Sequence, residues 1–255
     1  MSGAHENSAH ARSVYVDTTH MSTPYVNSLP LSCVRRTERI VRCLVAVVVL
    51  SAALTSELTA QVRRDTAAAR TLVELMTLDS TIRLDVKYAT NDNFMGRPMY
   101  TQARVFLQRP AAEAVVRAHR SLAAKGFGLL VFDGYRPWAV TKKFWDETPP
   151  VQRKFVANPR KGSKHNRGCA VDLTLFELAT GREVSMPSPY DDFSDKASSS
   201  YTGGTTEQRR LRGVLRAAME REGFRVEPSE WWHFDHKDWR NYPLLDIPFE
   251  NIPRR

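Results

Sequence analysis

The 255-residue sequence contains few cysteines and few histidines. Its three cysteines are too few for a disulfide framework or a four-thiolate zinc site. Glycine and proline, at 12 and 14 residues, are too scarce for a collagen-like or low-complexity chain. Because 42% of the residues are hydrophobic and 25% are charged, wholesale disorder is excluded and a sizeable core can form. The length fits one ordinary domain with an additional segment, or two small domains.

The first sixty residues differ in composition from the rest. Residues 1–34 are rich in Ser, Thr, His and Asn, without an apolar period. Arginines recur over 35–42, an apolar run covers 43–54, and small residues lead to position 60. A basic stretch, a short apolar run and a small-residue exit are the layout of a secretory signal peptide. We therefore predict a leader over residues 1–60, a mature domain over 61–255, and export to the periplasm or the medium.

The apolar run is shorter than the roughly 20 residues that a membrane-spanning helix needs. We therefore predict no stable membrane span after cleavage, with an uncleaved signal anchor as the alternative. Without the leader, the chain keeps 32 basic and 24 acidic residues and a net charge of +8. Nucleic-acid binding would require basic residues clustered on one face with stacking aromatics. The basic residues are instead scattered along this chain, so no nucleic-acid partner is predicted.

The hydrophobic patterns predict an α+β domain. Strands are predicted by alternation or by short apolar runs over residues 82–88, 127–132, 169–176 and 226–236. Helices are predicted over residues 110–124, 138–145 and 205–222. Thr205 and Gln208 have the spacing of a capping box at the start of the last helix. Since strands and helices do not alternate strictly, a doubly wound parallel sheet is excluded.

Two segments carry residue types that bind zinc. His165 lies in a polar loop, and Asp172 follows seven residues later in a predicted strand. Imidazole nitrogen and carboxylate oxygen are both ordinary zinc ligands, although for this pair alone a polar loop beside a strand Asp is the more common explanation. The second segment places Glu230 three residues before His233. Positions i and i+3 of a strand face opposite sides, so Glu230 must lie at a bend or strand end to share a site with His233.

A third segment, residues 133–137, reads DGYRP and follows a predicted buried strand. Arg136 in this turn is either a surface charge or a guanidinium that reaches into a cleft. A guanidinium directed at a developing oxyanion is a standard device for peptide hydrolysis. Three zinc ligands with an open position and a nearby carboxylate base would form a catalytic site of the same kind.

These segments occur in one order that resembles a known family. Residues 87–94 read KYATNDNF, 133–137 DGYRP, 163–174 SKHNRGCAVDLT and 230–233 EWWH. The series is similar to the zinc D-alanyl-D-alanine dipeptidases of the vancomycin-resistance (VanX-like) type, over roughly residues 74–248. The resemblance implies a single compact α+β domain in which helices flank a central antiparallel sheet and a cleft holds one zinc ion per chain.

The resemblance also implies roles for particular residues. His165, Asp172 and His233 would be the zinc ligands. Glu230 would be the general base that activates water and passes its proton to the leaving amine. Arg136 would stabilise the tetrahedral oxyanion.

Two further residues match positions that line the family's substrate pocket. These are Ser163 and Asp191, and Asp191 is expected to bind the free ammonium of a D,D-dipeptide. Cys169 stands where a small non-thiol residue is more usual, and we expect it to be a small buried residue. The secretory leader also departs from family members that act on cytoplasmic dipeptide.

The resemblance predicts hydrolysis of D-alanyl-D-alanine in the cell envelope, within peptidoglycan metabolism, D-alanine salvage or glycopeptide resistance. Two alternatives use the same zinc site. One is a D,D- or L,D-carboxypeptidase that trims peptidoglycan stem peptides and would need an open groove. The other is a peptidoglycan-binding module without activity, which the presence of Glu230 and Arg136 disfavours. The sequence fixes neither the stereospecificity nor the oligomeric state.

Overall fold

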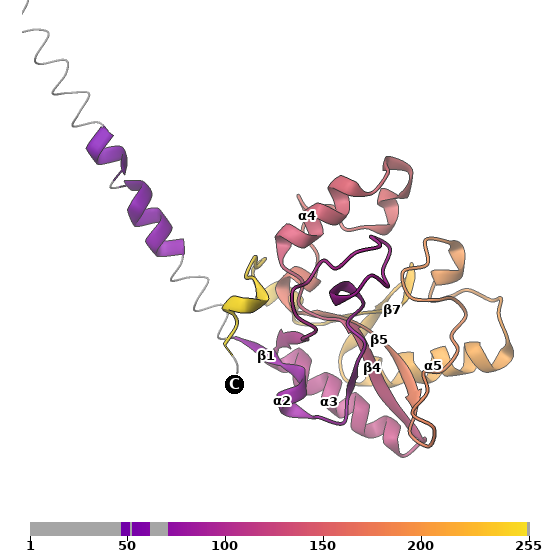
Figure 1. The fold of residues 1–255 in the computed structure, drawn as a ribbon. Coiled ribbons are helices and arrows are strands. Elements are labelled where there is room, and N and C mark those ends of the chain that lie inside the picture. The colour runs from indigo at the N-terminus through magenta and orange to yellow at the C-terminus, as the bar shows by residue number, and fades with distance from the viewer. Residues whose placement is uncertain (1–46, 52, 62–70, 254–255) are drawn as a thin grey trace, which may run out of the picture. The chain divides into compact units, whose positions relative to one another are not determined.

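The computed structural model describes residues 47–51, 53–61 and 71–253 (Figure 1). Residues 47–51 and 53–61 are helical, with side chains that are almost all exposed. No helix in these described ranges is long and apolar enough to cross a membrane. Most of the predicted leader lies outside the described residues, so its removal stays a prediction. The description below concerns residues 71–253.

The main sheet has five strands in the order β2-β4-β5-β7-β6. They are β2 (Arg83–Leu84), β4 (Phe127–Asp133), β5 (Ala170–Glu177), β7 (Glu230–His236) and β6 (Phe224–Glu227). The pairs β4–β5, β5–β7 and β7–β6 are antiparallel, whereas the short edge strand β2 runs parallel to β4. A second sheet pairs β1 (Leu72–Glu74) with β3 (Phe106–Gln108). The central antiparallel sheet is therefore confirmed, with one parallel pair at its edge.

Four helices in residues 71–253 complete the predicted α+β class. They are α2 (Leu75–Leu78), α3 (Arg109–Ala123), α4 (Trp138–Glu147) and α5 (Thr206–Arg221). Six short 3-10 helices connect the elements: η1 (Lys87–Ala89), η2 (Pro150–Phe155), η3 (His165–Arg167), η4 (Asp195–Ala197), η5 (Trp239–Asn241) and η6 (Phe249–Asn251). Helices α3 and α5 contact each other and the sheet, and α4 lies on the opposite side of the domain (Figure 1). The predicted capping box of α5 is present.

Two predicted strands differ in the structure. Only Arg83–Leu84 of the predicted strand 82–88 joins the sheet, and Lys87–Ala89 forms a 3-10 turn. Ile82, Val86 and Tyr88 of the alternating pattern are nevertheless buried, and Leu84 is partly buried, because the turn directs these side chains to the core as a strand would. The predicted strand 226–236 lies within a hairpin of β6 and β7. Glu227 pairs with Glu230 across a two-residue turn, which begins with a proline that could not donate to the ladder.

His119 links helix α3 to the sheet through a buried polar contact. Its Nδ1 accepts the backbone N–H of Leu129 at 3.0 Å, so the neutral ring carries its proton on Nε2. The Nε2–H group lies 3.0 Å from Thr81 Oγ1 and donates to it. Burial is the main reason why the pKa of His119 lies below its ordinary value. The folded state therefore holds this ring in its neutral form.

This arrangement predicts a loss of stability in mild acid. An unfolded chain binds the proton of His119 more readily, so the free energy of unfolding should fall as the pH drops below about 6.5. In His119→Asn, Oδ1 can replace Nδ1 as acceptor and does not titrate. Urea unfolding at pH 7.5 and pH 5 should therefore show a smaller pH effect in this variant. Equal pH effects in both proteins would contradict the assignment.

Candidate active site

Three neighbouring strands place polar side chains in one row across the sheet. Asp172 of β5 lies opposite Asp133 of β4 and opposite His233 of β7. Residues directly opposite one another in antiparallel strands share a face, with Cβ atoms about 5 Å apart. The β4–β5 register shifts between Val131 and Asp133, next to this row. The strand register alone therefore brings Asp172 and His233 together.

His165 reaches the same point from the turn η3. The turn ends at Gly168, whose φ of 67° is in the left-handed region and whose Cβ, if present, would lie 2.7 Å from the Leu72 side chain. The Nδ1–H of His165 donates to the carbonyl oxygen of Gly134 at 2.7 Å. Its Nε2 is therefore the free nitrogen, and it lies 3.3 Å from Asp172 Oδ1.

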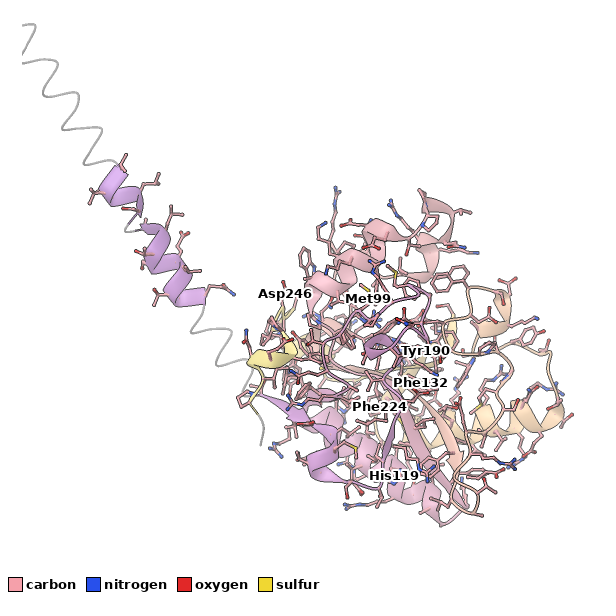
Figure 2. All side chains as sticks on the ribbon, in the orientation of Figure 1. Met99, His119, Phe132, Tyr190, Phe224 and Asp246 are labelled. Carbon is pink, nitrogen blue, oxygen red and sulfur yellow. The ribbon has the colours of Figure 1, made fainter. Side chains whose placement is uncertain are left out.

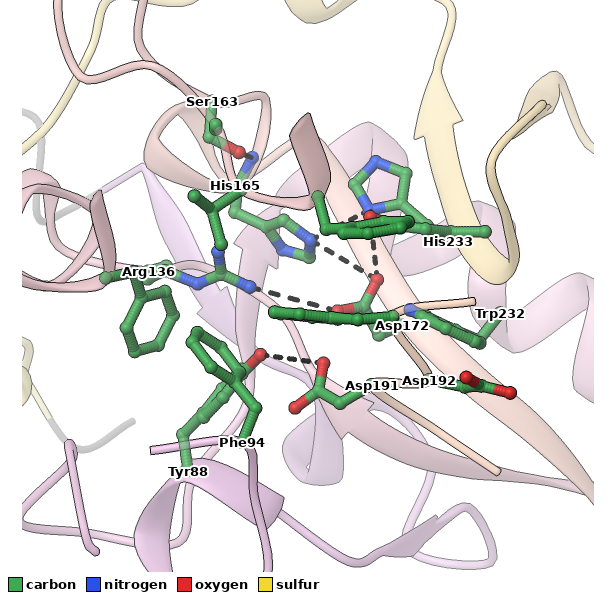
Figure 3. Close-up of a pocket in the computed structure, with 16 residues that line it drawn as sticks. Tyr88, Phe94, Arg136, Ser163, His165, Asp172, Asp191, Asp192, Trp232 and His233 are labelled. Atoms are coloured by element: carbon green, nitrogen blue, oxygen red, sulfur yellow. Dashed lines mark hydrogen bonds and ion pairs between the residues drawn. The ribbon is translucent and has the colours of Figure 1, made fainter. Parts of the chain in front are cut away.

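The three side chains offer a set of ligand atoms for a metal ion (Figure 3). One atom each of His165, Asp172 and His233 lies within 4.8 Å of the others, and all three residues are buried. Nε2 of His165 and Nδ1 of His233 face each other at 3.1 Å. Asp172 Oδ1 is buried and has no hydrogen-bond partner among the described residues. Two imidazoles and a carboxylate oxygen that contacts only these imidazole nitrogens, without a hydrogen bond, form a donor set that fits Zn²⁺.

The second oxygen of Asp172 is held by a neighbouring tyrosine. Tyr190 donates its hydroxyl to Asp172 Oδ2 at 3.0 Å, which leaves Oδ1 directed at the imidazoles. Burial raises the pKa of Asp172, but the imidazoles of His165 and His233 outweigh it and hold the pKa well below its usual value. Asp172 is therefore ionised, as a metal ligand must be.

His233 has an anionic partner on each side of its ring. Nδ1 lies 3.0 Å from Asp172 Oδ1, and Nε2 lies 2.9 Å from Asp235 Oδ1. Burial lowers the pKa of His233, but the two carboxylates outweigh it and hold the pKa well above its ordinary value. Metal binding through Nδ1 therefore has to displace a proton from this ring.

Glu230 is the first residue of β7 and follows the β6–β7 turn. This strand-end position lets it face the same site as His233, as the spacing of the two residues requires. Glu230 Oε2 lies 3.6 Å from His233 Nδ1. Burial is the main cause that raises the pKa of Glu230 to about 7. A carboxyl group with such a pKa can accept and return a proton near neutral pH.

Arg136 follows β4 and is fixed on several sides. Its Nε and Nη2 both donate to Asp133 Oδ2, at 3.0 Å and 2.7 Å. The guanidinium carbon lies 5.1 Å from the ring centre of Tyr88 and 4.9 Å from that of Phe144. Asp133 also accepts the hydroxyl of Tyr100 at 2.8 Å. Arg136 is thus a buried cation in a fixed place, 3.9 Å from Asp172 Oδ2.

Asp191 occupies the other side of the site. Its φ of 58° is the only positive value of a non-glycine residue in the described chain. Tyr88 donates its hydroxyl to Asp191 Oδ1 at 3.1 Å, whereas Oδ2 is buried and has no hydrogen-bond partner among the described residues. Burial, followed by the charge of Asp172, raises the pKa of Asp191 to about 8. A cationic group in the cavity would relieve this cost.

One small cavity of about 80 Å³ joins these groups. All seven site residues predicted from the sequence line it: Arg136, Ser163, His165, Asp172, Asp191, Glu230 and His233. Ser163 also accepts the backbone N–H of His165 at 3.2 Å. Aromatic rings form much of the remaining wall: Tyr88, Phe94, Phe144, Phe155, Phe193 and Trp232. None of the six residues labelled in Figure 2 lines this cavity, although Tyr190 contacts it indirectly by donating its hydroxyl to Asp172.

Three supporting residues were not predicted from the sequence. Asp133 accepts a hydrogen bond from Arg136, and Tyr190 donates one to Asp172. Asp235 is the hydrogen-bond partner of His233. Each of the three lies within three sequence positions of a residue that was predicted. Their partners, however, depend on strand register and loop packing, which a single sequence does not display. Cys169 is buried, as expected, and burial raises the pKa of its thiol to about 12.

A buried His–Asp–His ligand set with a carboxylate base and a cation beside it defines a metallopeptidase type of site. The chain belongs to the Peptidase_M15 family, described as D-ala-D-ala dipeptidase, whose model matches residues 68–253.

Two curated relatives agree with this assignment of the family. The chain is 35% identical over 191 residues to the D-alanyl-D-alanine dipeptidase of Enterococcus faecium, covering 67% of this chain and 89% of the relative. It is 32% identical over 178 residues to that of Escherichia coli (strain K12), covering 70% and 91%. The vancomycin-resistance D,D-pentapeptidase VanY, solved with Zn(II), is 17% identical with a TM-score of 0.35, covering 58% of this chain and 83% of that one. The last likeness is too distant to inform the substrate.

The site geometry predicts different roles for Glu230, as the base, and His233, as a metal ligand. Glu230→Ala should lower kcat by about 10²–10⁴-fold and leave zinc bound, because this carboxylate lies beside the ligand set and not in it. His233→Ala should lose both zinc and activity. Metal analysis after dialysis, with turnover measured in parallel, checks both expectations.

Glu227→Ala is the matched control, because Glu227 lies opposite Glu230 in the hairpin and does not line the cavity. It should keep both zinc and activity. Equal loss of zinc in the Glu230 and His233 variants would show that the two roles are wrongly assigned.

Proposed function

We propose that this metallopeptidase hydrolyses the free dipeptide D-alanyl-D-alanine to two D-alanines. The observation that carries the proposal is the small cavity that holds a candidate metal-ligand set at one side and, at the other, the Asp191 carboxyl group, whose buried Oδ2 has no hydrogen-bond partner among the described residues. A substrate that brings an ammonium group close to its scissile bond fits both features. The names of the relatives, D-alanyl-D-alanine dipeptidases, support this choice of substrate.

His165 Nε2, Asp172 Oδ1 and His233 Nδ1 would hold one zinc ion per chain. A bound zinc ion supplies Lewis acidity, which polarises the scissile carbonyl and makes water more acidic. Tyr190 and the Gly134 carbonyl keep two of the ligands in place through their outer atoms. The protein thereby fixes the ligand geometry before the substrate arrives.

Glu230 would move the proton. It lies on the metal-ligand side of the cavity, within 3.6 Å of His233 Nδ1, where attacking water would lie between it and the ligands. The carboxylate takes a proton from that water and passes it to the amine nitrogen as the peptide bond breaks. Because its pKa is about 7, Glu230 can both accept the proton from water and donate it to the amine at neutral pH.

Arg136 would stabilise the negative charge that develops on the carbonyl oxygen. Its position is set in advance by Asp133 and by the rings of Tyr88 and Phe144. A cation that needs no rearrangement during the reaction stabilises the transition state more than the ground state. Asp133 therefore contributes by orienting Arg136.

Asp191 would bind the substrate ammonium, and Ser163 would line the pocket beside it. An unpaired carboxylate in a dry pocket costs several kcal/mol, which an ammonium partner offsets. In a longer peptide the same nitrogen is a neutral amide that carries a chain. The cavity would then lose the charge pair and would also have to accommodate the chain.

This reasoning predicts selectivity for substrate length. The chain should hydrolyse D-Ala-D-Ala, with negligible cleavage of N-acetyl-D-Ala-D-Ala or of the same bond at the end of a stem pentapeptide. A loss of about 4 kcal/mol would lower kcat/KM by about a thousandfold. Asp191→Asn should impair dipeptide turnover and leave the zinc content unchanged.

Asp192→Asn is the matched control, because Asp192 lines the same cavity next to Asp191 but has no orphaned buried oxygen. It should affect kcat/KM much less. L-Ala-L-Ala tests stereospecificity in the same assay. Comparable kcat/KM values for the dipeptide, its acetylated form and the pentapeptide would overturn the proposal and favour a carboxypeptidase.

We also propose that residues 1–60 are a secretory leader and that the enzyme acts on peptidoglycan-derived dipeptide in the cell envelope. The order of basic, apolar and small residues over 35–60 supports this proposal. Mass spectrometry of the protein from an envelope fraction should find a mature N-terminus near Gln61. An intact chain that begins upstream of Cys43 would rule out cleavage.

A further inference from the structure

Asp235 and Lys164 form a polar chain behind the metal-ligand set. His233 Nε2 lies 2.9 Å from Asp235 Oδ1, and Asp235 Oδ2 lies 2.9 Å from the ammonium of Lys164. The side chain of Asp235 is only 14% exposed, and that of Lys164 is 33% exposed. Neither residue lines the cavity. The mechanism above therefore uses neither of them directly.

The Asp235 contact decides which nitrogen of His233 faces the ligand set. A carboxylate accepts hydrogen bonds and cannot donate one, so Nε2 must carry a proton to bond to Asp235. In the neutral ring this leaves a lone pair on Nδ1, the nitrogen that lies 3.0 Å from Asp172 Oδ1. Asp235 thereby selects the tautomer and the ring orientation that a metal ligand needs.

Lys164 connects this contact to the other histidine ligand. It directly precedes His165, and its backbone carbonyl accepts the N–H groups of Arg167 and Cys169 at 3.0 Å and 3.1 Å. Its side chain reaches across to Asp235 on β7. One ion pair therefore joins the turn that carries His165 to the strand that carries His233.

We propose that Asp235, held by Lys164, is a positioning residue that preforms the zinc site. It fixes the tautomer and rotation of His233. Its ion pair with Lys164 holds the turn that carries His165 next to the strand that carries His233. The inference rests on the zinc ligands of the proposed function. Mutation of a residue that hydrogen-bonds to a metal ligand typically weakens metal binding by about 10–100-fold.

The zinc dissociation constant, measured by competition with a chromogenic chelator, is the primary readout. Asp235→Ala in the otherwise intact chain should weaken zinc binding by about 10–100-fold. The isosteric Asp235→Asn, whose amide oxygen can still accept from Nε2, should show a smaller loss. Lys164→Met should also show a smaller loss, and its effect should largely vanish when Asp235 is already Ala, because Lys164 acts through Asp235.

The Co²⁺-loaded protein provides a second readout. Its visible absorption should shift in Asp235→Ala, because a freely rotating His233 alters the ligand geometry at the metal. Asp238→Asn is the matched control: Asp238 lies near the end of the same strand, 3.8 Å from His236, which is not a ligand. It should leave both the dissociation constant and the spectrum unchanged. Circular dichroism confirms that each variant is folded.

Zinc binding by Asp235→Ala within twofold of the parent chain would overturn the inference. Equal weakening in Asp238→Asn would also overturn it, since the effect would then be one of net charge. Failure of the proposed ligand set has a different signature. In that case His233→Ala would keep its zinc, whatever the result for Asp235.

Discussion

The register of three antiparallel strands is the constraint on which the whole site depends. It sets Asp133, Asp172 and His233 side by side on one face of the sheet. A slip of one residue between β5 and β7 would place Asp172 and His233 on opposite faces of the sheet. Arg136 is held by Asp133, and Glu230 begins the strand that carries His233. Each reactive group is thus placed relative to this row.

The site also concentrates carboxyl groups where water is scarce. Asp172, Asp191 and Glu230 share a cavity of about 80 Å³ in which Arg136 is the one cationic side chain of Arg or Lys. Two buried carboxylate oxygens, Asp172 Oδ1 and Asp191 Oδ2, have no hydrogen-bond partner in the described part of the chain. Buried polar atoms without partners are rare and costly. Their positions match the two cations that the proposed reaction brings: the metal ion at Asp172 and the substrate ammonium at Asp191.

The sequence allowed the helices to be predicted, together with seven candidate site residues that line one cavity, but not the residues that hold them. The capping box of α5 and the strand-end position of Glu230 follow from local spacing, and both are present. The predicted strand over 82–88 was mostly wrong, because burial of alternate side chains is satisfied equally by a 3-10 turn around Tyr88. Asp133 and Asp235 could not be assigned partners, since these depend on pairing between strands that are distant in the sequence.

The two candidate histidine ligands are held by different means, and this difference has consequences for the proposed metal site. The outer nitrogen of His165 donates to a neutral carbonyl, that of Gly134, whereas the outer nitrogen of His233 faces the charged Asp235. A carboxylate partner makes an imidazole a more basic ligand than a carbonyl partner does. His233 should therefore donate more strongly to a metal, but it also holds its proton more tightly in the free protein. The site gains ligand strength at the cost of competition from protons, which lowers metal affinity as the pH falls.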